Sequence, residues 1–142
     1  MAKIGLEAAQ NLFRMIVEGT HFDRVLRKAT IVALSPSKCT CEMTVEEEHA
    51  NKHGTLHGGM ASTLVDTVST VAIMASDRSA AGVSTDLSVS FVRAAKIGER
   101  IRIDAECLKA GRSLAYANVT ISRCSDDAIL CTGKHTKFFT EK

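Results

Sequence analysis

The chain has 142 residues, 45% of them hydrophobic and 24% charged, which is the composition of one globular domain covering residues 1–142. A formal net charge of only +2 and an aromatic content of 4% argue against a dedicated nucleic-acid-binding protein. No apolar run approaches the roughly 18 residues of a membrane-spanning helix, and the N-terminus lacks the apolar core of a secretory signal.

The first part of the chain is predicted to form a helix followed by a pair of strands. Apolar residues recur at helical spacing over residues 6–18, and residues 23–27 suggest a short helical turn. A turn at Pro36 separates predicted strands at residues 30–34 and 38–46. Apolar and polar residues alternate in the second strand, which predicts a sheet with one face in water.

A polar loop over residues 47–57 leads into the longest predicted helix, residues 58–76, which would span about 27 Å at the α-helical rise per residue. Its apolar stripe consists of Leu64, Val65, Val68, Val71, Ala72 and Ala75. Three or four strands should follow as an antiparallel meander with tight turns at Gly98 and Gly111. One long helix against one antiparallel sheet is an α+β fold. The predicted strands are residues 83–92, 100–108, 113–122 and 129–139.

The start of the long helix is the first candidate for chemistry. Gly58 and Gly59 would let a substrate approach the backbone, and the first N–H groups of a helix have no internal partner. Such donors stabilise the negative charge that develops on a carbonyl oxygen. The alternative is that paired glycines only allow close packing of the helix on the sheet.

Asp66 lies a little over two turns into the same helix, on a stripe of small and polar residues. Such a stripe is usually a solvated helix face. If a partner subunit or a sheet edge covered it, Asp66 would be a buried carboxylate suited to act as a base. The stripe consists of Gly59, Ser62, Thr63, Asp66, Ser69 and Thr70.

A metal site is not expected. His49, His53 and His57 are spaced by four and could ligate a metal if they shared a helix. Gly54 and Gly58 make a helix through this segment improbable, and no cysteine is placed to assist. His57 is expected to pack or hydrogen-bond near the reacting group.

Nucleophilic catalysis has weak support. The chain contains no Gly-x-Ser-x-Gly elbow, and Ser84, near the start of a strand, would ordinarily be a surface hydroxyl. The five cysteines form no Cys-x-x-Cys pair, so we expect reduced, buried thiols. A reducing compartment favours the cytoplasm, and the mitochondrion stays open.

Basic residues gather late in the chain, where loop cations could hold the phosphates of coenzyme A. The alternative is an ordinary charged surface, which is the better interpretation for Arg100 and Arg102. The candidates for phosphate binding are Arg93, Lys96, Lys109 and Arg112.

At this point the sequence resembles the hotdog-fold acyl-CoA thioesterases. The resemblance is specific because several motifs combine, and it covers essentially the whole chain. It implies a hotdog fold, in which an antiparallel sheet of about six strands wraps one long central helix with a further helix at the N-terminus. The motifs are residues 45–51 (VEEEHAN), 54–59 (GTLHGG) and 63–66 (TLVD), supported by residues 22–26, 82–84 and 133–137.

The resemblance also implies roles for particular residues. Gly58 N–H and Asn51 would polarise the thioester carbonyl, and His57 would position the substrate or Asn51. Asp66 and Ser84 would come from a neighbouring subunit to orient and activate water, with direct attack by Asp66 as a chemical variant. Coenzyme A would be bound by Phe91, Val92, Arg93, Lys96, Lys109, Gly111, Arg112 and Ser113.

Three functions are therefore carried forward. The first is hydrolysis of medium- to long-chain fatty acyl-CoA in lipid metabolism, without a metal or other cofactor, by a dimer of dimers. The second is hydration or dehydration of acyl thioesters, and the third is an acyl-CoA- or protein-binding module without catalysis. A lipid-transfer protein is a further partner that the resemblance implies.

Overall fold

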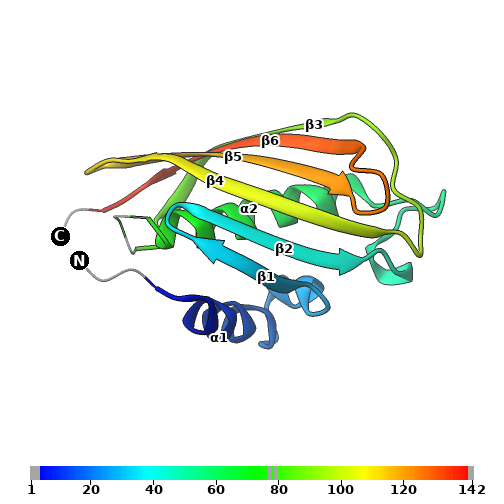
Figure 1. Ribbon diagram of the computed structural model, residues 1–142, viewed down its shortest axis with the longest axis horizontal. Helices are drawn as coiled ribbons and strands as arrows, with labels where there is room; N and C mark the ends of the chain where they lie inside the picture. Colours follow the sequence, from blue (N-terminus) through cyan, green and yellow to red (C-terminus); the bar gives the residue numbers. More distant parts are fainter. Residues whose placement is uncertain (1–3, 77, 79, 141–142) are drawn as a thin grey trace.

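The computed structural model describes residues 4–76, 78 and 80–140, in which one antiparallel sheet of six strands curves around a long helix (Figure 1). The predicted elements are confirmed, and their bounds lie within two residues of those observed. In chain order the elements are α1 (Leu6–Val17), the 3₁₀ helix η1 (Phe22–Leu26), β1 (Thr30–Ser35), β2 (Lys38–Thr44), the 3₁₀ helix η2 (Glu47–His49), α2 (Gly58–Met74), β3 (Val83–Phe91), β4 (Arg100–Ala110), β5 (Leu114–Arg123) and β6 (Ile129–Phe138).

The order of strands in the sheet is β1-β2-β4-β5-β6-β3. Strands β4, β5 and β6 form the expected meander, but the prediction that β3 belongs to it beside β4 is wrong. β3 lies at the far edge, where Val89 faces Gly133 of β6. Alternating hydrophobicity identifies a strand without identifying its neighbour, and this explains the error.

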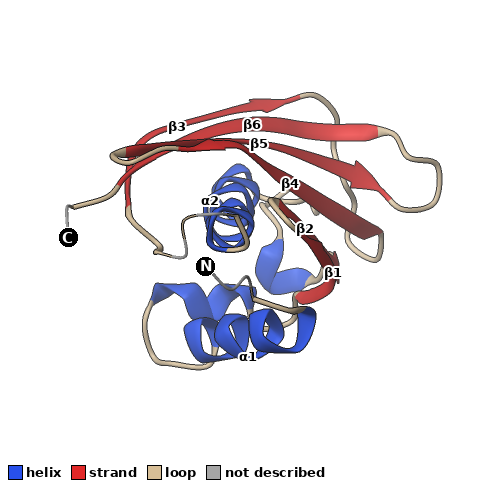
Figure 2. Ribbon diagram, turned by 60° about the vertical axis from the view of Figure 1, so that its left-hand side comes forward, coloured by secondary structure: helices blue, strands red, loops and turns tan. Residues whose placement is uncertain are grey.

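Helix α2 lies in the hollow of the sheet and supplies the centre of the core (Figure 2). The apolar stripe predicted for it is confirmed, because Leu64, Val65, Val68, Val71, Ala72 and Ala75 are all buried. The alternating residues of β2 meet it from the sheet, with Cys39, Cys41 and Met43 fully buried. This packing fixes the rotation of α2, and therefore the direction in which its polar residues point.

The two edges of the sheet differ. At the β1 edge, helix α1 packs alongside, and the Gln10 side-chain amide donates to the carbonyl oxygen of Ile31 at 2.8 Å (Figure 1). At the β3 edge every residue of the strand is exposed except Val89, which is half-buried. Leu87 and Phe91 on β3 are 38% and 59% exposed, so apolar side chains accompany the open edge.

Within the described residues, no helix has the length and apolar character needed to cross a membrane.

Candidate active site

The loop before α2 holds the side chain of Asn51 in a fixed orientation. Its Oδ1 accepts the backbone N–H groups of His53 at 2.9 Å and Thr55 at 3.2 Å. With the oxygen assigned in this way, Nδ2 donates to Thr55 Oγ1 at 2.9 Å. Since an amide nitrogen carries two hydrogens, the second N–H of Asn51 has no acceptor among the described residues.

His57 caps the start of α2. Its Nδ1 accepts the N–H of Gly59 at 2.8 Å, so the second amide of the helix has a partner. The first amide, that of Gly58, has no acceptor among the described residues. Met60 N–H also has no acceptor among the described residues, so the cap leaves the amides of Gly58 and Met60 as free donors at the positive end of the helix dipole. His57 makes no hydrogen bond with Asn51 in this part of the structure, so its suggested role in orienting Asn51 stays a prediction.

The Gly58 amide and Asn51 share a cavity of about 350 Å³. Its wall combines polar groups with apolar ones, as a site for an acyl thioester would require. The ring of Phe91 lies so close to Gly58 that a Cβ there would stand 3.3 Å from it. The cavity is lined by Asn51, Thr55, Leu56, Gly58, Ala61, Phe91, Val92, Arg93, Ala94, Ala95 and Cys131.

A second polar cluster surrounds Asp66. The imidazole of His135 is fully buried and contacts two hydroxyls at 2.7 Å, with Nδ1 on Ser69 Oγ and Nε2 on Ser84 Oγ. Asp66 Oδ1 lies 3.6 Å from Nε2, and the Asp66 side chain is 45% exposed. Asp66 and Ser84, predicted as partners, are therefore brought together by a histidine that the sequence did not indicate.

A buried lysine completes this cluster. Lys137 follows His135 by two positions on β6 and donates from Nζ to Thr70 Oγ1 at 2.8 Å. Burial lowers the pKa of Lys137, and the charge of Asp66 opposes that change. Burial also lowers the pKa of His135, against the attraction of Asp66, so a neutral imidazole is favoured.

The polar stripe predicted on α2 is thus partly covered within one chain. Ser69 and Thr70 are buried under β6, whereas Asp66 and Ser62 are only half-buried. Asp66 does not line the cavity of Gly58, and neither does Ser84. One chain therefore carries an amide half, at Gly58 and Asn51, and a carboxylate half, at Asp66, of the candidate site without joining them.

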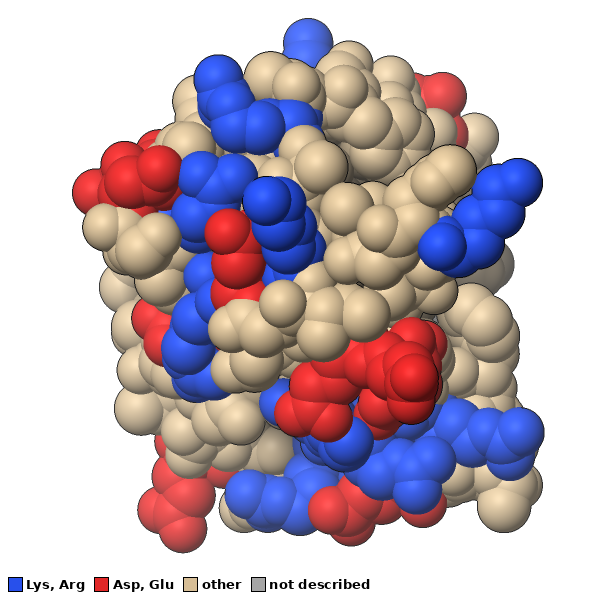
Figure 3. All heavy atoms as spheres, turned by 90° about the vertical axis from the view of Figure 1, so that its right-hand side faces the viewer, with Lys and Arg blue, Asp and Glu red and all other residues tan. Residues whose placement is uncertain are grey.

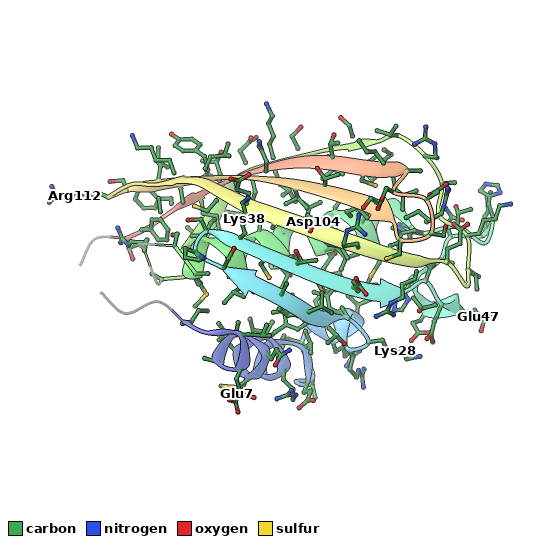
Figure 4. The ribbon with its side chains drawn as sticks, in the orientation of Figure 1. Glu7, Lys28, Lys38, Glu47, Asp104 and Arg112 are labelled. Atoms are coloured by element: carbon green, nitrogen blue, oxygen red, sulfur yellow. The ribbon has the colours of Figure 1, made fainter. Side chains whose placement is uncertain are left out.

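The residues expected to bind coenzyme A also separate into two groups. Phe91, Val92 and Arg93 line the cavity, and the segment that follows is tied to the Asn51 loop by a bridge between Thr55 and Lys96. The end of β4, with Lys109, and the turn to β5, with Gly111, Arg112 and Ser113, lie at the opposite end of the molecule. Figure 4 shows this separation, with Arg112 at one end and Glu47 at the other.

Charged side chains at the end that carries the Asn51 loop are mixed in sign (Figure 3). Lys28 pairs with Glu48 at 2.8 Å, and Arg123 pairs with Asp126 at 3.0 Å. This face lacks the continuous basic surface that is typical of nucleic-acid binding.

The histidines and cysteines of the described residues form no cluster of three or more potential metal ligands with each other or with carboxylates. His49 is buried, and its Nδ1 accepts the N–H of Glu46 at 3.0 Å. Burial raises the pKa of both Cys39 and Cys41 to about 12, so these thiols are poor nucleophiles at neutral pH.

Sequence reasoning missed His135 and Lys137 as members of the site. The signal was present in the strand pattern, because alternation along β6 places residues 131, 133, 135 and 137 on one face. Since that face packs on α2, a histidine and a lysine at two of its positions had to find buried polar partners.

A curved antiparallel sheet around one long helix, with a cavity at the helix start, defines a hotdog-fold domain. The family model of the thioesterase superfamily matches residues 53–129, and the chain belongs to that superfamily.

Similar proteins cover nearly the whole chain. The mouse protein named acyl-coenzyme A thioesterase 13 is 50% identical over 116 residues, which are 82% of this chain and 83% of that protein. The human protein of the same name is 41% identical over 131 residues, 92% of this chain and 94% of that protein. The crystal structure of zebrafish thioesterase superfamily member 2 is 46% identical, with a TM-score of 0.94, and the match covers 96% of this chain and 99% of that one.

Proposed function

We propose that this protein hydrolyses acyl-CoA thioesters, in particular those of medium- to long-chain fatty acids, to free fatty acid and coenzyme A. The observation that carries the proposal is the unpaired Gly58 amide, which shares a cavity with the spare N–H of Asn51. Two hydrogen-bond donors on the wall of one cavity suit the oxyanion of an acyl-transfer intermediate. The names of the mouse and human relatives support coenzyme A as the thiol carrier.

In the proposed reaction, the thioester carbonyl oxygen accepts hydrogen bonds from Gly58 N–H and Asn51 Nδ2. Water attacks the carbonyl carbon while Asp66 takes one of its protons, so a C–O bond forms and the oxygen becomes an anion. The intermediate collapses, the C–S bond breaks, and the proton held by Asp66 passes to the departing sulfur. A fixed donor at the helix start contributes roughly 3 kcal/mol to such a transition state.

The two halves of the site would be joined by a second copy of the chain. The bare edge of β3 offers backbone donors and acceptors along its length, with apolar side chains such as Leu87 beside them. Pairing there about a two-fold axis would bring Asp66 and Ser84 of the partner subunit to the cavity of Gly58.

The same pairing accounts for the divided coenzyme A residues. Arg93 and Lys96 would approach the phosphates from one subunit, and Lys109 and Arg112 from the other. Guanidinium and ammonium groups form charge-assisted hydrogen bonds with phosphate, so the nucleotide end would lie between subunits.

The resemblance also predicts that two such dimers form a homotetramer, that the protein acts in the cytoplasm or the mitochondrion, and that a lipid-transfer protein is a partner. These remain predictions. Sedimentation of the purified protein tests the prediction of a homotetramer.

The proposal is tested by incubating the protein with a panel of acyl-CoA substrates and following thiol release with a thiol reagent. Thiol release should increase on medium- and long-chain substrates, whereas hydration of a 2-enoyl-CoA would favour the hydratase alternative. Tight binding without release of thiol would favour a binding module instead.

Asp66→Asn gives a sharper test, because the amide is isosteric and is a far weaker base. We expect kcat to fall by about a hundredfold or more while affinity for coenzyme A is kept. Asp104→Asn, the same chemical change on β4, is the control and should keep full activity. Unchanged turnover in Asp66→Asn would remove Asp66 from the mechanism.

A further inference from the structure

His135 is a fully enclosed member of the cluster around Asp66, although one of the groups that it contacts lies on an exposed strand. Its side chain is 0% exposed, whereas the Asp66 side chain is 45% exposed and Ser84 lies on the exposed strand β3. The imidazole therefore stands behind the carboxylate and the hydroxyl, where it can orient them without touching a substrate.

Counting hydrogens gives one self-consistent direction for the hydrogen bonds around His135. The Ser69 hydroxyl has one hydrogen and lies 3.1 Å from the backbone carbonyl oxygen of Asp66, to which it donates. With that hydrogen on the carbonyl oxygen, the Ser69 oxygen accepts from Nδ1 of His135 at 2.7 Å, and this direction corresponds to the tautomer with its proton on Nδ1. Nε2 is left as an acceptor, and the Ser84 hydroxyl donates to it at 2.7 Å.

This arrangement makes Ser84 an acceptor on its exposed side. Its only hydrogen is occupied by His135, so its remaining lone pairs point toward whatever lies in front of it. The carboxylate oxygens of Asp66 are acceptors too, and the imidazole does not occupy Oδ1, which lies 3.6 Å from Nε2, beyond hydrogen-bonding distance. A water molecule that gives one hydrogen to each of these acceptors would present a lone pair in the opposite direction.

We propose that His135 is a positioning residue for the hydrolytic reaction: by accepting the Ser84 hydroxyl hydrogen, it turns Ser84 into a fixed acceptor beside Asp66, and the two acceptors orient the attacking water. This inference rests on the proposed thioester hydrolysis. The neutral state it requires agrees with the effect of burial, which lowers the pKa of His135.

The first test compares two amide replacements of His135 that differ in reach. The longer side chain introduced by His135→Gln extends to about the position of Nε2 and keeps a partner for Ser84. The shorter one introduced by His135→Asn reaches only about as far as Nδ1 and keeps the contact with Ser69. We expect kcat to fall by about tenfold or more in His135→Asn and by less than about threefold in His135→Gln, with KM nearly unchanged in both.

A double-mutant cycle tests the route of the effect. If His135 acts through Ser84, then His135→Asn in a Ser84→Ala background should lower kcat no further than Ser84→Ala alone. Losses that multiply would overturn the inference, and so would equal kcat in His135→Asn and His135→Gln.

Ser69→Ala supplies an independent test that leaves His135 in place. Without an acceptor for Nδ1–H, the ring should adopt the other tautomer and donate from Nε2, so that Ser84 turns its own hydrogen outward. We expect kcat to fall severalfold although Ser69 touches no substrate, and an unchanged kcat would contradict the hydrogen count.

Control variants distinguish a loss of folding from a loss of the positioning of Ser84 by His135. Ile103→Val, at a buried position of β4, which β5 separates from β6, should lower the melting temperature while keeping kcat. If the wild-type chain releases no thiol from any acyl-CoA, the proposed function fails and the inference with it. If the wild type is active and the cycle is additive, only the inference fails.

Discussion

The contact between Gly58 and Phe91 gives the glycine a role beyond backbone freedom. A Cβ at position 58 would stand 3.3 Å from two atoms of the exposed ring of Phe91, which can move aside. We therefore expect Gly58→Ala to keep its melting temperature but to displace the ring from the cavity wall. Activity on acyl-CoA should fall by about tenfold, mainly through KM.

Gly5→Ala is the matched control for this change, because a Cβ at Gly5 meets nothing within 4 Å. Full activity in Gly58→Ala would show that the ring of Phe91 does not shape the substrate cavity. The comparison is made from initial rates across a range of substrate concentrations.

The buried His49 predicts how stability depends on pH. Burial lowers its pKa below the ordinary value of 6.5, and its Nδ1 is occupied by the N–H of Glu46. The unfolded chain therefore binds a proton more readily than the folded one, so stability is full above about pH 6.5 and is lost as the pH falls below it. His135 has a shift of the same sign.

Urea unfolding at about pH 7.5 and about pH 5.5 measures this effect, because carboxylates stay largely ionised between those values. The unfolding midpoint should drop at the lower pH in the wild type and should drop less in His49→Gln. An equal drop in both proteins would show that His49 does not contribute.

At the scale of single residues, the sequence identified those parts of the candidate site that lie close together along the chain. Gly58 and Asp66 were identified because they belong to one helix and its start. His135 was not, because it lies 66 positions from Ser69 and meets it only when β6 packs on α2. The role of His135 depends on partner residues whose positions in space cannot be read from the sequence.

At the scale of elements, the contact between α2 and β6 relies on the absence of a side chain. A Cβ at Gly133 would stand 2.8 Å from Cγ1 of Val65 and 3.4 Å from the carbonyl oxygen of Ser88. We expect Gly133→Ala to lower the free energy of unfolding by about 1–3 kcal/mol through overpacking.

The cause is checked in a Val65→Ala background, where the obstructing methyl groups are gone. In that background Gly133→Ala should lower the free energy of unfolding, measured with a denaturant, by much less. An equal cost in both backgrounds would assign the effect to the strand backbone and not to the contact with α2.

The elements also show which features of the fold the spacing of apolar residues predicts and which it does not. Helix α2 and the strands were predicted to within two residues, because their apolar residues repeat at the spacing of each structure. The position of β3 in the sheet was not predicted, because its pattern of residues indicates an extended strand but does not identify β6 as its neighbour. That error matters here, because the position of β3 puts Ser84 beside His135.

For the whole molecule, the proposed division of the site between two subunits can be tested by complementation. Asp66→Asn and Asn51→Ala would each be inactive alone, since each spoils both sites of a homodimer. After unfolding and refolding together, mixed dimers would hold one intact site, restoring about a quarter of wild-type activity at equal amounts. Separately refolded samples mixed afterwards are the control, and no recovery in the co-refolded sample would place the site within one chain.

The unequal edges of the sheet limit how far such pairing can extend. Gln10 on α1 already occupies the carbonyl oxygen of Ile31 at the β1 edge, whereas the β3 edge is open. A strand added at β3 by a second copy uses the open border of both molecules at once, and each outer border then carries its own α1. If the proposed dimer forms in this way, growth by strand addition would end at two copies and would not continue into a ribbon.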